Sequence, residues 1–150
     1  MFNKYINSIQ LKINEDLKAI YTYGPKSLVD TFNYVISGEG KRVRPLLTIL
    51  TSESLFEDSK KSYNAALAIE ILHNFTLVHD DIMDKDSIRH GKETVHKKWN
   101  DSTAILTGDL MLAKSLKILS DSNYSNKVMK SFNNALVAVC EGQALDKEFE

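Results

Sequence analysis

Apolar residues recur along this chain at intervals of three and four, the spacing that aligns side chains on one face of an α-helix. One stripe covers residues 2–20, a second about 27–36, and a third carries Pro45 in its first turn and runs to about residue 55. Residues 62–83 are apolar on nearly every side, which is typical of a helix in the middle of a bundle. The pattern predicts an all-α fold, an antiparallel helical bundle.

The helical pattern has one interruption. Residues 85–101 are polar and charged, and we predict a loop with a short helix there. A fifth helix is expected over about 102–119 and a sixth from about residue 124 onward. The last stripe keeps its helical spacing as far as Gln143, and no glycine, asparagine or proline follows to end the helix. We therefore expect the bundle to be incomplete at its C-terminus.

Composition limits the class of protein. The chain has 150 residues, 43% of them hydrophobic, which is the size of one domain. Its 19 basic and 20 acidic residues create no overall field for nucleic acid. No run approaches the roughly 20 apolar residues that span a bilayer, and no signal-peptide pattern is found. We expect a soluble, cytoplasmic protein without stable membrane insertion, whose single cysteine, Cys140, is a core thiol.

The strongest chemical signal is the HDDIMD segment at residues 79–84, at the end of the apolar helix. A spacing of four puts Asp80 and Asp84 on one face, with Asp81 turned by about 100°. Three carboxylates repel one another and oppose the helix dipole, so a cation should compensate them. Mg²⁺ binds carboxylate oxygens well and commonly binds substrate phosphates at the same time. The segment is therefore either a magnesium–phosphate site or a solvated acidic helix end.

A basic loop precedes the third helix. The sequence GKRVRP at residues 40–45 places Lys41, Arg42 and Arg44 between a glycine break and a helix start. Flexible backbone, helix N-terminal amides and an arginine fork can together cradle phosphate. For this loop alone, a solvated charged turn is the simpler interpretation. Together with the acidic helix end, however, it fits a substrate whose diphosphate is held partly by metal and partly by cationic side chains.

Five landmarks in this order and spacing resemble the trans-isoprenyl diphosphate synthases, also called polyprenyl synthetases. They are GKRVRP at 40–45, His73 with HDDIMD at 79–84, Arg89-His90-Gly91, Gly108-Asp109, and Gly142-Gln143 with Asp146. The resemblance covers essentially the whole chain. It implies a bundle of the isoprenoid synthase type, with residues 1–150 as the N-terminal portion of a single isoprenoid synthase domain.

The resemblance also implies a catalytic centre made of Asp80, Asp81, Asp84 and Arg89. Asp80 and Asp84 would bind the Mg²⁺ ions that hold an allylic diphosphate, and Asp81 would support them. Arg89 would contact the same diphosphate. The implied reaction is ionisation of the allylic diphosphate, attack by the double bond of isopentenyl diphosphate, and loss of a proton.

Isopentenyl diphosphate is the second implied substrate. Lys41, Arg44 and His73 match the positions that hold its diphosphate in the family, and Arg42 and His90 complete the expected substrate-binding set. On the residues alone, His73 could instead be a satisfied core histidine. His90 stands where the family usually has a second arginine, so the site would be one permanent charge short.

Four further residues receive roles by resemblance. Gln143 and Asp146 match a helix that lines the reaction cavity, although ordinary helix surface is the simpler interpretation. Phe75, about one turn before the aspartates, resembles the floor that limits product length in short-chain enzymes, with the small Thr76 beside it. Phe75 could equally be a core residue. We predict products of the farnesyl or geranylgeranyl type, with geranylgeranyl favoured.

One expected element is missing from the sequence. The family needs a second aspartate-rich motif on a later helix, and nothing after Asp84 supplies one. The chain alone should therefore be inactive. We expect a fragment of a synthase, with a non-catalytic diphosphate-binding or regulatory subunit as the alternative. A metal-dependent phosphohydrolase using His73, His79 and Asp80 is a weaker alternative. A homodimer is expected by resemblance.

Overall fold

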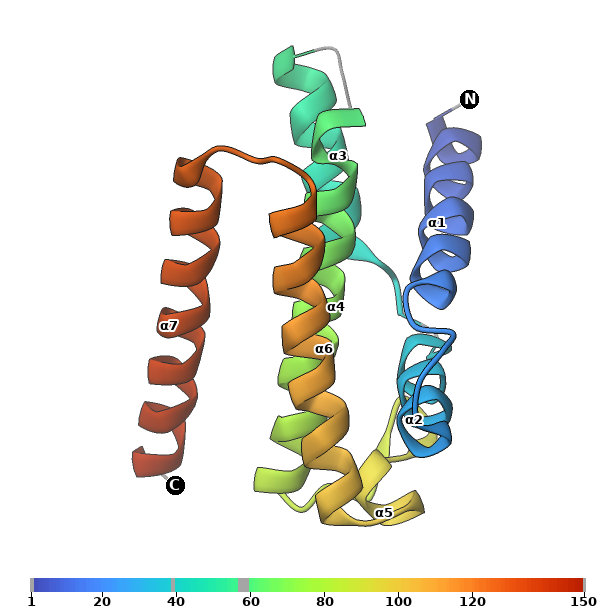
Figure 1. Cartoon of the computed structure of the whole chain (residues 1–150), viewed down its shortest axis with the longest axis vertical. Coiled ribbons are helices and arrows are strands. Elements are labelled where there is room, and N and C mark those ends of the chain that lie inside the picture. The colour runs from blue at the N-terminus through green and yellow to red at the C-terminus, as the bar shows by residue number, and fades with distance from the viewer. Residues whose placement is uncertain (1, 39, 57–59, 150) are drawn as a thin grey trace.

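The computed structural model describes residues 2–38, 40–56 and 60–149 and confirms the all-α prediction. The helices are α1 (Phe2–Ala19), α2 (Lys26–Ile36), α3 (Val43–Phe56), α4 (Lys60–Met83), α5 (Val95–Lys98), α6 (Asp101–Asp121) and α7 (Asn126–Phe149). In Figure 1, α4, α6 and α7 run in alternating directions, as an antiparallel bundle requires, and α1 and α2 lie on the side away from α7. None of the helices described is long and apolar enough to cross a membrane.

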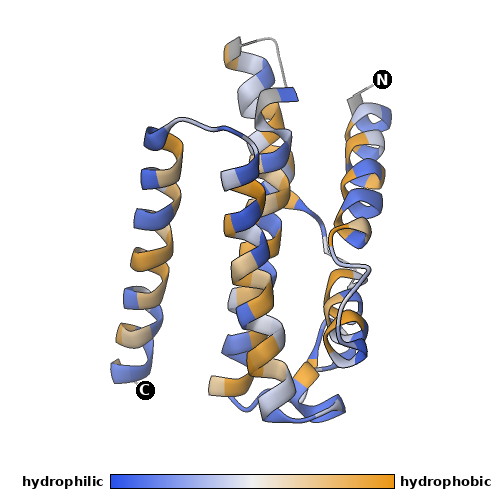
Figure 2. Ribbon diagram, in the orientation of Figure 1, coloured by the Kyte–Doolittle hydropathy of each residue, from blue (hydrophilic) through white to orange (hydrophobic). Residues whose placement is uncertain are grey.

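Helix α4 is the centre of the bundle, as its nearly all-apolar sequence predicts. It packs along α6 and against α3, and its buried side chains Ile71 and Phe75 belong to the main core. From α1, Ile13 and Leu17 enter the same core, and Figure 2 shows the apolar side of α1 turned toward α4 and α6. This packing fixes the course of α4 and therefore the position of its carboxyl end.

Helix α7 packs less extensively on the rest of the bundle. Its one buried side chain among the described residues, Phe132, joins Ala68 and Leu119 in a small second cluster. Farther along α7, Val139 is 45% exposed and the thiol of Cys140 is also exposed. The prediction of a core thiol is therefore wrong, because this part of α7 leaves these side chains exposed instead of packing them into the core.

A small hairpin follows α4. Strands β1 (Ile88–Arg89) and β2 (Lys92–Glu93) pair antiparallel, with Arg89 opposite Lys92. The two residues between them, His90 and Gly91, have φ values of 50° and 77°, as a type I′ hairpin turn requires. The predicted short helix in this segment is confirmed as α5, whereas the hairpin was not predicted.

Helices α4 and α6 approach closely at Gly108. A Cβ atom on Gly108 would lie 2.2 Å from Nε2 of His79. The His79 ring is already held in place, since it packs edge-on against Phe75 with ring centroids 4.8 Å apart, and its Nε2 lies 3.3 Å from the carbonyl oxygen of Ile105. The glycine therefore makes room for the histidine that precedes the aspartates.

We expect Gly108→Ala to lower the free energy of unfolding by about 1–3 kcal/mol, since the added methyl must displace a packed side chain. Gly142→Ala is the matched control, because among the described residues nothing beyond its chain neighbours and its own helix backbone lies within 4 Å of the added Cβ. That change should be neutral or stabilise by up to about 1 kcal/mol. Urea unfolding followed by circular dichroism measures both, and equal effects would contradict the close approach.

Candidate active site

The carboxyl end of α4 is fixed by its own backbone. The amide of Lys85 donates to the carbonyl of Ile82 at 3.3 Å, and the amide of Asp86 donates to the carbonyl of Asp81 at 2.9 Å. Lys85 lies in the left-handed region at φ 58°. These features form the Schellman arrangement that closes helix ends. The closure determines where the aspartates on and after the last turn of α4 lie.

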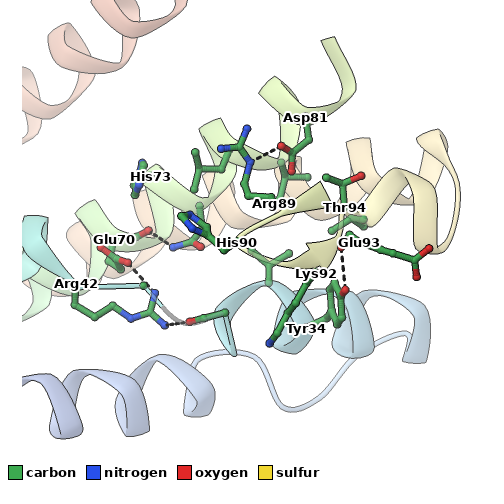
Figure 3. Close-up of a pocket in the computed structure, with 17 residues that line it drawn as sticks. Tyr34, Arg42, Glu70, His73, Asp81, Arg89, His90, Lys92, Glu93 and Thr94 are labelled. Carbon is green, nitrogen blue, oxygen red and sulfur yellow. Dashed lines mark hydrogen bonds and ion pairs between the residues drawn. The ribbon is translucent and has the colours of Figure 1, made fainter. Parts of the chain in front are cut away.

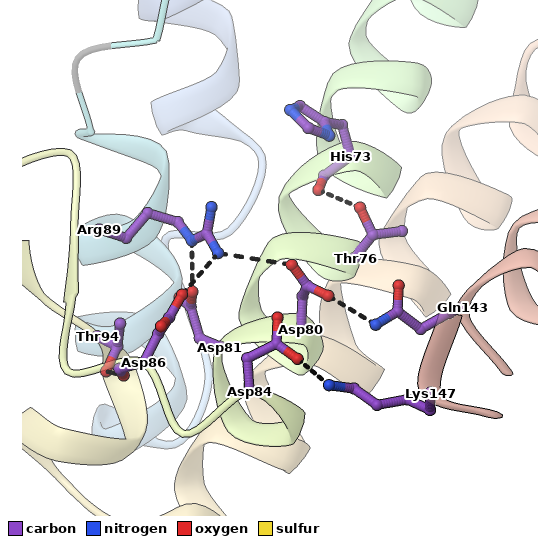
Figure 4. Close-up of polar contacts among 10 residues, drawn as sticks. All are labelled: His73, Thr76, Asp80, Asp81, Asp84, Asp86, Arg89, Thr94, Gln143 and Lys147. Carbon is purple, nitrogen blue, oxygen red and sulfur yellow. Dashed lines mark hydrogen bonds and ion pairs between the residues drawn. The ribbon is translucent and has the colours of Figure 1, made fainter. Parts of the chain in front are cut away.

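Arg89, from β1, compensates one side of this acidic end (Figure 4). Its Nε donates to Asp81, and its Nη2 lies 3.5 Å from Oδ2 of Asp80 and 3.5 Å from Oδ2 of Asp86. The chain after α4 thus returns Arg89 to the side of a helix that ended six residues earlier. Asp86 was not predicted from the sequence.

Helix α7 compensates the other side. Gln143 Nε2 donates to Oδ1 of Asp80 at 2.8 Å, and Lys147 pairs with Asp84. The sequence analysis named Gln143 but missed Lys147, although a spacing of four on one helix could have indicated it. Asp146 is exposed and makes no hydrogen bond or ion pair with any residue that the structure describes.

Burial and charge act together on the central pair. Burial raises the pKa of Asp81, whose side chain is only 6% exposed, and the contact with Arg89 opposes that change. For Arg89, burial disfavours the charged form, but the contact with Asp81 and the fields of Asp80 and Asp86 outweigh it and raise the pKa. Asp81 is therefore the least accessible of the three predicted aspartates. Asp80 and Asp84, with side chains 29% and 33% exposed, are the accessible carboxylates.

Two cavities flank the end of α4. The first, about 120 Å³ in volume, lies between α2, α4 and the hairpin; its wall is mainly apolar but also carries polar and charged side chains, including those of His73, Asp81, Arg89 and His90 (Figure 3). The second, about 430 Å³, lies between α4 and α7. It is lined mainly by apolar groups and reaches one acidic residue; the lining is Phe75, Thr76, Leu77, His79, Asp80, Met83, Val139, Cys140, Gln143, Ala144 and Lys147.

The basic loop presents its three cations differently. Lys41 and Arg44 are exposed, whereas Arg42 is buried and pairs with the buried Glu70 at 2.8 Å. Arg42 also lines the first cavity, but its guanidinium is bound within the protein, so this geometry favours a structural role over the predicted role in substrate binding. Glu70 was not singled out from the sequence, since its partner is 28 residues away.

His73 lines the first cavity, about two turns before the aspartates. Burial lowers its pKa, and the charges of Arg44, Arg89 and Arg42 lower it further, against an opposing effect of Glu70. His73 therefore favours the neutral form, in a cavity where arginines already supply positive charge.

The lowered pKa of His73 gives a testable pH dependence. The unfolded chain takes up a proton at this residue at a higher pH than the folded chain does. The stability that His73 contributes is thus present above the ordinary histidine pKa of about 6.5 and is lost as the pH falls below it. His73→Gln should reduce the loss of unfolding free energy between about pH 8 and pH 5, measured by urea unfolding. A variant with the wild-type pH slope would contradict this assignment.

Several known proteins are similar to this chain in sequence and in fold. A geranylgeranyl diphosphate synthase of Saccharolobus solfataricus is 39% identical over 155 residues, a match that covers 99% of this chain and 46% of that protein. A short chain isoprenyl diphosphate synthase of Methanocaldococcus jannaschii is 42% identical, covering 95% and 44%. The solved geranylgeranyl pyrophosphate synthetase of Geoglobus acetivorans superposes with a TM-score of 0.91 at 39% identity, covering 97% and 49%.

These matches cover nearly all of this chain but only part of each relative. The chain spans about half the length of the curated relatives it matches. The family model described as polyprenyl synthetase matches residues 25–150, which include the basic loop, the aspartates of α4 and Gln143. This chain belongs to the polyprenyl synthetase family.

Proposed function

We propose that this chain is the N-terminal portion of a single isoprenoid synthase domain that condenses isopentenyl diphosphate with an allylic diphosphate. The observation that carries the proposal is the pair of cavities on either side of one acidic helix end. Both have mainly apolar walls; the smaller cavity adjoins Asp81 and has several charged side chains in its lining, whereas the larger one adjoins Asp80 and has fewer. Such a division suits two diphosphates, one of which carries a long hydrocarbon chain. The names of the relatives favour a geranylgeranyl product.

The accessible carboxylates fit Mg²⁺. Asp80 and Asp84 lie one turn apart, and both face α7 through their contacts with Gln143 and Lys147. No group of three His, Cys, Asp or Glu side chains converges among the described residues. Magnesium does not require one, because it commonly takes one or two carboxylates and completes its shell with water and substrate phosphates. When bound, it would neutralise the charge that develops on the departing diphosphate.

The chain's own residues would assist that departure. Arg89 already spans Asp80 and Asp81, so it can donate to diphosphate oxygens that arrive beside them. Apolar walls around the larger cavity, such as Phe75 and Val139, would hold the hydrocarbon chain and keep water from the allylic cation. Breaking the carbon–oxygen bond and forming the new carbon–carbon bond require no protein nucleophile, so Cys140 needs no covalent role.

Isopentenyl diphosphate would bind on the hairpin side. We assign its diphosphate to Lys41 and Arg44, with His73 and His90 at the adjoining cavity. His90 occupies a left-handed turn position and lines that cavity, so an imidazole stands where the family usually has an arginine. Asp146, exposed on α7, retains only the role that the resemblance suggests.

The histidine–aspartate phosphohydrolase is the less favoured alternative. His79 packs against Phe75 and over Gly108, whereas His73 lines the cavity on the hairpin side. The two histidines are therefore not grouped with Asp80 around one ion. A homodimer and a cytoplasmic location remain predictions from the sequence.

The first test is incorporation of labelled isopentenyl diphosphate into chain-length-resolved products, with Mg²⁺ and an allylic starter. It compares this polypeptide with its gene extended through any downstream coding sequence. In the active form, Asp80→Asn or Asp84→Asn should lower turnover by about 100-fold or more, as expected for loss of a preorganised electrostatic contact.

Asp121→Asn, at the far end of α6, should keep wild-type activity, because that aspartate is exposed and its one ion pair among the described residues is with Lys117. Product from neither form would contradict the proposal and favour a non-catalytic diphosphate-binding subunit. Full activity of the Asp80 and Asp84 variants would contradict their assignment as metal ligands.

Product length provides a second test. Phe75 lines the larger cavity, so Phe75→Leu should lengthen the cavity and shift products toward longer chains in the same assay. Phe132→Leu is the matched control, since Phe132 is also 9% exposed but lies in the separate cluster with Ala68 and Leu119. Both changes should cost comparable stability, about 1 kcal/mol or more. Identical product distributions from the two variants would contradict the assignment of Phe75 as the floor of the larger cavity.

A further inference from the structure

The basic loop contains one cation that the proposed chemistry leaves unused. Arg42 lies between Lys41 and Arg44, yet it is 5% exposed while both neighbours are exposed. A buried arginine is costly unless its charge is paired and its donors are satisfied. Its partners therefore indicate what it does.

The Arg42 guanidinium joins three parts of the fold. Nε donates to Oδ1 of Asn14 on α1 at 2.8 Å, and Nη1 donates to Oε1 of Glu70 on α4 at 2.8 Å. Nη2 donates to the carbonyls of Ile36 at 2.7 Å and Gly38 at 3.1 Å, at the end of α2. These bonds use four of the five N–H groups of an arginine. Figure 3 shows the guanidinium between Glu70 and the end of α2.

The backbone at Arg42 needs such support. Its φ of 50° lies in the left-handed region, which residues other than glycine rarely adopt unless the surroundings hold them there. Gly40 makes room for the guanidinium, since a Cβ atom on Gly40 would lie 3.0 Å from Nη1. Gln10, one turn before Asn14 on α1, also fixes the loop by donating to the carbonyl of Lys41 at 2.9 Å.

The charge of Arg42 is also accounted for. Glu70, 4% exposed, neutralises it within the protein. Arg42 and Glu70 both line the first cavity, but because they neutralise each other there, a diphosphate at the loop would interact mainly with the exposed Lys41 and Arg44. Arg44 is close enough to the first cavity to lower the pKa of His73, which lines it.

We propose that Arg42 is a positioning residue, which together with Asn14 and Glu70 holds the basic loop in the left-handed turn that sets Lys41 and Arg44 for the diphosphate of isopentenyl diphosphate. This inference rests on the proposed function for its ligand. It replaces the role in direct substrate binding that the sequence predicted for Arg42.

The test is titration calorimetry of isopentenyl diphosphate with the 150-residue chain. Asn14→Ala removes one partner of the guanidinium without changing any charge, and Asn14 does not line the cavity. It should weaken binding about 3–10-fold, the effect of losing one hydrogen bond to a charged group. Arg42→Lys keeps the charge but loses the planar guanidinium that reaches several partners at once, and should weaken binding by about tenfold or more. Asn7→Ala, an exposed asparagine on the same helix, should bind as wild type does.

The second readout is Mg²⁺-dependent binding of an allylic thiodiphosphate, which does not use the basic loop. Both variants should leave it unchanged. Equal loss of both ligands would indicate general destabilisation and overturn the proposal. Weaker isopentenyl diphosphate binding in Arg42→Lys but not in Asn14→Ala would show that the contact with Asn14 does not position the loop, and would also overturn the proposal. If Arg42→Lys fails to fold, the result for Asn14→Ala decides: weaker isopentenyl diphosphate binding supports the proposal, and wild-type binding overturns it. A wild-type chain that binds no isopentenyl diphosphate would instead refute the proposed function.

Discussion

Carboxylates gathered at the carboxyl end of a buried helix must be compensated, because they repel one another and oppose the helix dipole. In this chain the compensation comes from both sides of α4. Arg89 of the hairpin pairs with Asp81, and Lys147 of α7 pairs with Asp84. Asp80 has contacts on both sides. The same requirement would favour a divalent cation at this helix end, which could in turn hold a diphosphate, and the two cavities lie where the hairpin and α7 meet α4.

Features that depend on local periodicity could be predicted from the sequence. The central position of α4 follows from its apolar residues on nearly all sides, and the common face of Asp80 and Asp84 follows from a spacing of four. The first-turn position of Pro45 in α3 follows from its fixed φ and missing amide hydrogen. The resemblance also identified Gln143 as a residue near the site, and its amide does contact Asp80.

Features that depend on distant partners could not be predicted. Arg42 looks like a ligand-binding cation in its own segment, and only Glu70, on another helix, makes it a buried structural residue. Lys147 is separated from Asp84 by 63 positions. The two-residue strands around His90 are too short to show alternation. Cys140 sits in an apolar stretch that would be core if α7 packed closely, but the structure leaves it beside the larger cavity.

The most direct measurement is titration of the chain with a non-reactive allylic thiodiphosphate in the presence and absence of Mg²⁺. If Asp80 and Asp84 hold magnesium for a diphosphate, binding should be saturable and magnesium-dependent. Lys147→Met should then weaken it less than Asp84→Asn does, because the metal takes over the role of the lysine. Binding that ignores Mg²⁺, or that survives replacement of both aspartates, would contradict a metal–diphosphate site at this helix end.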